Sequence, residues 1–212
     1  MKAPGRTGSR WVAISAVAAL LAAMTIRLGE APATVAEQRA RLPPAAECES
    51  EIAGKWKALV YSQATTSWYE YSMEVRHVDG SPTALTGTIN VDAWTGSPTD
   101  SEPGECRGNR RMRGKMKARG TFIKGEVFFG GEDFELVEIL CGDRRGIGYN
   151  PDQFTGRLEK ERNEFQSVNN DGGAAVNEPS VFRRIGCFDD EARPNPDVKA
   201  PPFFPARNEG GC

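Results

Sequence analysis

The sequence of 212 residues has one histidine, His77, and five cysteines without a Cys-x-x-Cys pair. Zinc sites usually need several imidazoles or paired thiolates, so the chain lacks the common metal-ligand sets. The GxxxxGK(S/T), GxGxxG, HExxH and GxSxG motifs are also missing. His77 falls at the end of a predicted strand, where nothing places a nucleophile beside it. We therefore expect a protein with no metal, no cofactor and no catalytic residues.

The chain also lacks a strong excess of charge of either sign. Its formal net charge is -2, and 39% of its residues are hydrophobic and 26% charged. A disordered chain would have fewer apolar residues, and a nucleic-acid-binding domain would carry a marked basic excess. The composition therefore predicts an ordinary globular domain that has no nucleic acid among its partners.

Residues 1–33 have the features of an export signal. Lys2, Arg6 and Arg10 precede an uncharged, mostly apolar run from Trp11 to Ile26. This run is slightly shorter than the roughly 20 residues of a membrane-spanning helix, and Ala31-Pro32-Ala33 offers a small-x-small cleavage site. Two alternatives follow: a hydrophobic helix retained as a membrane anchor, or a cleaved signal peptide. The rest of the chain then lies at the periplasmic face of the inner membrane, or is secreted.

The remaining chain divides into three parts. Residues 34–47 are rich in Ala, Pro and charge, and we interpret them as a linker. Residues 48–187 have the size of one domain. Residues 188–212 are rich in proline, which predicts an extended tail. All five cysteines follow the apolar run, so an oxidising compartment would let them form disulfides.

Residues 48–187 show a periodicity of two. The clearest segment is RMRGKMKAR, in which basic residues alternate with small or apolar ones. Several such segments are separated by turn sequences, among them Gly130-Gly131 and Asn170-Asp171-Gly172-Gly173, which are typical of tight hairpins. We expect an all-β fold, an antiparallel meander of eight to ten strands closed as a barrel, with a β-sandwich as the alternative. Closure is favoured because it removes exposed sheet edges.

Gly54-Lys55-Trp56, at the start of the first predicted strand, resembles the GxW signature of lipocalins and other calycin barrels. Arg183 or Arg184 matches the late arginine that packs across this tryptophan in the family. The family's middle Thr-Asp-Tyr-like motif has no counterpart here. Cys48 followed by the same Gly-Lys-Trp is more distantly similar to avidin-like barrels. The resemblance implies a calycin-like barrel over residues 48–187 that holds a small ligand.

The cysteine positions suggest a pairing. Cys48 precedes the first predicted strand and Cys187 follows the last, so the two would meet at the seam of a closed barrel, which leaves Cys106 and Cys141 as the second pair. Other pairings stay open, since Cys212 could bond Cys187 or Cys106 or form an intermolecular link.

Three groups of residues are candidate sites. Inward-facing residues of the first two strands either fill the barrel or line a pocket for a small apolar ligand: Trp56, Tyr69, Tyr71 and Met73. A basic stripe on one strand face could bind an anionic partner, or could be a solvated face neutralised by Asp133, Glu135 and Glu138: Arg111, Arg113, Lys115, Lys117 and Arg119. Phe203 and Phe204 in the tail form a third candidate surface, for a protein partner.

We therefore expect an exported, membrane-anchored, non-catalytic β-barrel that acts as an interaction or accessory subunit of a membrane complex. Its contacts would be the N-terminal helix in the membrane, the basic stripe and the tail. The first alternative is a lipocalin-like carrier of a small apolar ligand, and the second is an enzyme of an unrecognised type.

Overall fold

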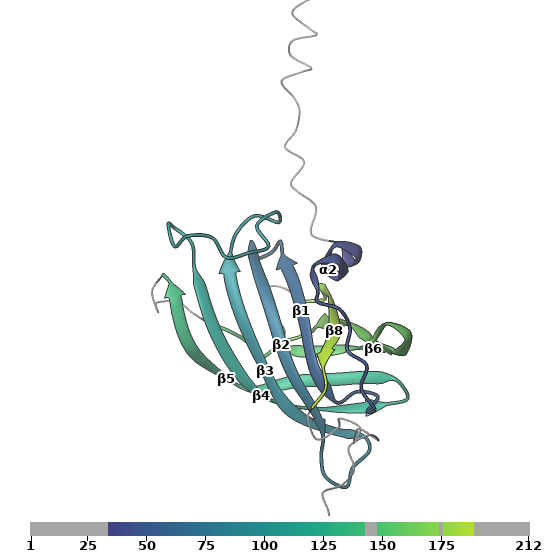
Figure 1. Cartoon of the computed structure of the whole chain (residues 1–212). Coiled ribbons are helices and arrows are strands. Elements are labelled where there is room, and N and C mark those ends of the chain that lie inside the picture. Colours follow the sequence, from purple (N-terminus) through teal and green to yellow (C-terminus); the bar gives the residue numbers. More distant parts are fainter. Residues whose placement is uncertain (1–33, 143–147, 174–175, 189–212) are drawn as a thin grey trace, which may run out of the picture. The chain divides into compact units, whose positions relative to one another are not determined.

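The computed structural model describes residues 34–142, 148–173 and 176–188 (Figure 1). Eight antiparallel strands follow one another in chain order, and the last pairs with the first to close a barrel. The strands are β1 (Gly54–Ser62), β2 (Ser67–His77), β3 (Ala84–Thr95), β4 (Arg111–Ile123), β5 (Glu126–Cys141), β6 (Gln153–Glu159), β7 (Glu164–Asn169) and β8 (Pro179–Gly186). A 3-10 turn, η1 (Lys160–Arg162), joins β6 to β7. The expected meander barrel is confirmed, and the sandwich alternative is wrong.

The β4–β5 hairpin differs from the expectation. Its turn is Lys124-Gly125, where both residues have positive φ angles of 53° and 83°, the conformation of a tight primed turn. Gly130-Gly131, predicted to be a hairpin turn, instead lies inside β5. A Cβ atom on Gly130 would lie 2.0 Å from the side-chain oxygen of Gln153, and one on Gly131 would lie 2.6 Å from the sulfur of Met116. These two glycines therefore make room for neighbouring side chains rather than turning the chain.

Aromatic side chains form much of the core of the barrel. Trp56 is fully buried in edge-to-face contact with Phe165, and Phe165 stacks on Phe182. The indole N–H of Trp56 donates to the carbonyl of Ile52 at 2.9 Å. The guanidinium of Arg184 lies 5.5 Å from the Trp56 ring centre and donates to carbonyls of the segment that enters β1. The tryptophan–arginine contact implied by the calycin resemblance is thus present, and it involves Arg184.

Helix α2 (Val35–Arg41) precedes the barrel, within the segment interpreted as a linker. Thr34 and Glu37 form a capping box at its first turn, and the helix ends shortly before Pro43-Pro44. Leu42, just after the helix, belongs to an outer apolar cluster with Trp68 and other residues of the sheet. Part of the segment interpreted as a linker is therefore packed on the barrel wall.

The helix also completes the seam of the barrel. β1 and β8 pair over a short stretch only, from Lys55 with Gly186 to Lys57 with Arg183. Beyond this point the buried side chain of Gln38 takes the place of a strand, because its amide donates to the carbonyl of Pro179 and accepts from the N–H of Val181.

A buried carboxylate lies next to the seam. Glu164, at the start of β7, is 1% exposed. Arg39 of α2 donates to one of its oxygens at 2.7 Å, and Arg183 of β8 donates to the other at 2.6 and 3.0 Å. Two cations thus neutralise this carboxylate, which is the usual requirement for a buried charge.

Two disulfides join Cys48 to Cys187 and Cys106 to Cys141, the pairing that the sequence favoured. The first links the chain before β1 to the chain after β8. Disulfides persist in oxidising compartments, so these bonds indicate an extracytoplasmic environment. The predicted anchor or signal in residues 1–33, most of the predicted tail and Cys212 lie outside the described residues. Within the described ranges, no helix has the length and apolarity needed to cross a bilayer.

Candidate functional site

The barrel interior is open at one end. The connections after β1, β3, β5 and β7 lie at this end, which we call the mouth, opposite the end filled by Trp56. Two adjoining cavities of about 230 and 200 Å³ occupy the mouth, and they share Thr65, Tyr69 and Gly148. Both are smaller than the roughly 300–1,000 Å³ of sites for drug-sized ligands. The mouth therefore has room for a small molecule.

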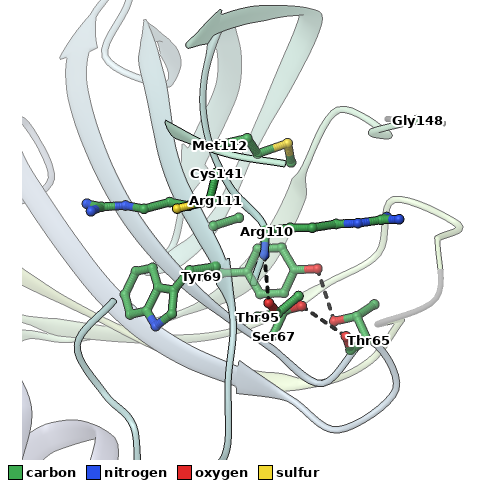
Figure 2. Close-up of a pocket in the computed structure, with 11 residues that line it drawn as sticks. Thr65, Ser67, Tyr69, Thr95, Arg110, Arg111, Met112, Cys141 and Gly148 are labelled. Atoms are coloured by element: carbon green, nitrogen blue, oxygen red, sulfur yellow. Dashed lines mark hydrogen bonds between the residues drawn. The ribbon is translucent and has the colours of Figure 1, made fainter. Parts of the chain in front are cut away.

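The first cavity combines apolar and cationic groups (Figure 2). Tyr69, Arg110 and Met112 extend to the same side, whereas Arg111 points the opposite way. The Tyr69 hydroxyl is fixed by a hydrogen bond of 3.0 Å to the hydroxyl of Thr65. Within the described part of the chain, Arg110 makes no ion pair. Its guanidinium is thus available to an anionic group at the rim.

The second cavity ends at a buried carboxylate. Asp152 is 1% exposed and accepts hydrogen bonds from three side chains. The Tyr71 hydroxyl donates to Oδ1 at 3.1 Å, the Asn169 amide donates to Oδ1 at 2.7 Å, and the Tyr149 hydroxyl donates to Oδ2 at 2.8 Å. We call these four residues the mouth cluster.

Separate parts of the fold hold the mouth cluster in place. Tyr71 is an inward-facing residue of β2, and Asn169 is the last residue of β7. Asp152 directly precedes β6, where its carbonyl accepts from the N–H of Gly131 at 2.8 Å. The side-chain oxygen of Asn169 accepts a hydrogen bond from the backbone N–H of Gln153 at 3.0 Å, which fixes the orientation of the Asn169 amide group.

Tyr149 lies beside the part of β5 that has no partner strand in β6. β5 pairs with β6 only from Glu126 to Gly130, so its later part has a strand partner on one side only. The Tyr149 ring covers this gap by stacking on Phe134 of β5, with ring centres 4.5 Å apart. The same stacking fixes the position from which its hydroxyl reaches Asp152.

Burial raises the pKa of Asp152 to about 7, and the charge of Asp171 acts in the same direction, against the three hydrogen bonds. Burial and the charge of Asp152 also place the pKa of the Tyr71 hydroxyl well above its ordinary value. Burial likewise raises the pKa of Tyr149. The tyrosines are therefore neutral donors at physiological pH, whereas Asp152 exchanges its proton near neutrality.

Each state of Asp152 has its own set of donors and acceptors. When the carboxylate is ionised, both tyrosine protons are directed at it, and the contact of 3.5 Å between the Tyr71 and Tyr149 oxygens carries none. When Asp152 is protonated, its O–H can donate to Tyr149, which turns its own proton toward Tyr71. The mouth cluster can thus accept or release a proton without a change of fold.

The four residues predicted to lie inside the barrel occupy two different regions of it. Tyr69 and Tyr71 line the mouth, as a pocket would require. Trp56 and Met73 are buried in the aromatic core and line neither cavity. The barrel is therefore filled at one end and hollow at the other, which combines the two alternatives left open by the sequence.

The basic stripe lies on the outward face of β4. Acidic residues of both neighbouring strands pair with its arginines: Arg111 and Arg113 contact Asp92, Arg113 also contacts Glu138, and Arg119 contacts Glu132. Lys115 and Lys117 are exposed and make no ion pair with the described residues. The stripe is partly neutralised, which favours a solvated face.

Phe203 and Phe204 lie outside the described residues, as does the N-terminal segment. The predicted role as an accessory subunit of a membrane complex depends on these parts, and it stays a prediction.

Sequence reasoning missed Tyr149, Asp152 and Asn169. They lie in a connection or at a strand end, where the alternation of apolar and polar residues gives no signal. Asp152 is 81 residues from Tyr71 in the sequence, so only the closed barrel reveals their contact.

An eight-stranded antiparallel closed barrel is consistent with the calycin-like fold expected from the sequence. Comparisons with protein-family models, with curated proteins and with solved structures find no match to this chain. Among the described residues, no group of three or more His, Cys, Asp or Glu side chains is arranged to hold a metal ion. The geometry of the mouth therefore carries the functional argument.

Proposed function

We propose that the protein is a binding protein for a small molecule, held in the mouth of the barrel and contacted by the mouth cluster. The observation that carries this proposal is the burial of the Asp152 carboxylate at the end of a cavity. Removing a carboxylate from water without a cation costs stability. Such a cost is common at functional sites, where groups are held ready for a ligand.

The lining of the two cavities supports a ligand with both apolar and polar parts. Tyr69, Ala93 and Met112 offer apolar contacts, while Asp152 and Arg110 offer polar ones. The purely apolar ligand suggested by the calycin resemblance would leave these polar groups without partners. The proposal thus keeps the carrier hypothesis and changes the chemistry of the cargo.

The test uses three small aromatic probes that share a phenylethyl group and differ in charge: phenethylamine, phenethyl alcohol and hydrocinnamate. Binding is followed by NMR chemical shifts of the purified protein. At least one probe should shift the resonances of Tyr69 and Tyr71. The variant Ala93→Phe places a bulky ring in the first cavity, and it should weaken binding while the barrel stays folded by circular dichroism.

The surface variant Val137→Phe enlarges an exposed residue of β5 and serves as the control. It should bind like the wild-type protein. Failure of all three probes to shift any mouth residue would overturn the proposal, as would binding that Ala93→Phe leaves unchanged.

A further inference from the structure

We infer that the ligand of the mouth is an organic cation whose protonated nitrogen lies against Asp152 among the tyrosine rings. This inference rests on the proposed binding function and names the chemical class of the ligand. Its first support is a contrast between two buried carboxylates of the same barrel. Glu164 at the seam is paired with Arg39 and Arg183. Asp152 has no cationic partner in the part of the chain that the structure describes.

The second support is the direction of the hydrogen bonds. The Tyr71 and Tyr149 hydroxyls direct their protons at the ionised carboxylate, so their oxygen lone pairs remain as acceptors. Oδ2 of Asp152 accepts from Tyr149 alone and keeps a further acceptor position. A ligand that reaches this point therefore meets mainly acceptors, and an ammonium group, which has only donors, satisfies them best.

The third support is the arrangement of the aromatic rings. Tyr69, Tyr71 and Tyr149 all line the second cavity. The Tyr69 and Tyr71 rings are nearly parallel, at an angle of 9° with centres 6.1 Å apart. Electron-rich ring faces attract cations, and several rings around one site form the usual cage for an alkylated ammonium group.

The charged and ionisable groups around Asp152 also favour a cationic ligand. The ionisable groups that face it are Tyr71 from β2, Tyr149 from the segment before β6 and Asp171 from the segment after β7. Tyr69 and Glu178 are more distant neutral and acidic groups at the same end. Arg110 and Arg111 both line the other cavity of the mouth. Arg111 is paired with Asp92, so Arg110 is the cation that faces the far end of a ligand.

The inference is tested with the same probes, by calorimetry at pH 8. Phenethylamine should bind at least about tenfold more tightly than phenethyl alcohol, since a charge-assisted hydrogen bond replaces a neutral one. Asp152→Asn should reduce the amine affinity by about tenfold to a hundredfold and leave the alcohol affinity within about threefold. Asp171→Asn makes the same change in charge at the rim, and it should keep the preference for the amine.

A pH series adds a readout that a merely structural role of Asp152 would not move. The carboxylate is protonated below its pKa of about 7, so amine affinity should fall about tenfold for each pH unit below this value. The alcohol affinity should stay constant, and Asp152→Asn should remove the pH dependence.

The outcomes separate the inference from the proposed function. If the alcohol binds the mouth as tightly as the amine, or hydrocinnamate binds more tightly, the mouth binds small molecules but the cation assignment is wrong. If no probe binds, both fall. If Asp152→Asn proves unfolded, Tyr149→Phe replaces it. The Tyr149 hydrogen bond lowers the pKa of Asp152, so its loss should raise the pH at which amine affinity declines only when Asp152 is the acceptor of that proton.

Discussion

The buried Asp152 makes the stability of the fold depend on pH. In the unfolded chain an aspartate has a pKa of about 3.9, whereas burial raises the pKa of Asp152 to about 7 in the fold. The folded state therefore holds this proton more tightly than the unfolded state. Stability from Asp152 is fully present below about pH 4 and is lost as the pH rises to about 7, above which the loss is complete.

Replacing Asp152 with Asn should remove this pH-dependent loss. We expect the free energy of unfolding of Asp152→Asn, relative to the wild-type protein, to increase between about pH 4 and 7, by up to about 4 kcal/mol. Urea denaturation at several pH values measures the difference, with Asp171→Asn as a control for net charge. A difference that stays flat across this range would contradict the assigned burial of the carboxylate.

Residues of the mouth cluster show why sequence patterns locate the wall of a barrel more easily than its site. Tyr69 and Tyr71 belong to an alternating strand, and the sequence identified both. Asp152 and Asn169 carry side chains that are common in turns, and nothing local distinguishes them from solvent-exposed residues. Their role follows from burial, which the local sequence does not encode.

At the scale of elements, helix α2 acts as a substitute strand. Gln38 supplies one donor and one acceptor to the edge of β8, where β1 no longer pairs with it. The sequence pattern indicates only a linker for this segment. The docking of α2 on the barrel was not predicted. The segment is mostly charged or small residues around one glutamine, a composition that is also typical of a solvent-exposed helix.

Gln38→Ala should therefore destabilise the barrel. The substitution removes the partners of the Pro179 carbonyl and of the buried Val181 N–H, which costs about 2 kcal/mol. Gln63→Ala removes the same atoms from an exposed turn and is expected to change stability by less than about 0.5 kcal/mol. Chemical denaturation compares the two variants, and equal midpoints would show that the helix contributes nothing to the seam.

The β4–β5 hairpin illustrates a limit of turn signals. Gly-Gly is a strong local signal, yet the chain turns at Lys124-Gly125. Met116 and Gln153 occupy the space that side chains at Gly130 and Gly131 would take. Packing between strands thus decided the role of these glycines, and no window of local sequence contains that information.

At the scale of the whole molecule, the Cys48–Cys187 disulfide closes the barrel. It joins residues separated by 139 positions, whereas the Cys106–Cys141 disulfide spans 35. In a chain-entropy model the longer loop contributes about 5 kcal/mol and the shorter one about 4 kcal/mol, since the restriction of the unfolded chain grows with loop length.

Replacing Cys48 and Cys187 together with serine should lower the melting temperature by well over about 5 °C under oxidising conditions. Replacing Cys106 and Cys141 should lower it less. Calorimetry of both double variants, with and without reductant, measures the order. The opposite order, or a wild-type melting temperature that reductant does not change, would show that the seam does not depend on its disulfide.

The sequence by itself determined the β content, the meander, the closure and the positions of the cysteines at the seam. These features depend on periodicity, turns and chain order, which act between neighbours along the chain. Only the tertiary structure decided that one end of the barrel is filled and the other hollow, and that Asp152 lies buried between Tyr71, Tyr149 and Asn169. Register and curvature bring these residues together, and both result from side chains packing across strands that are remote in sequence.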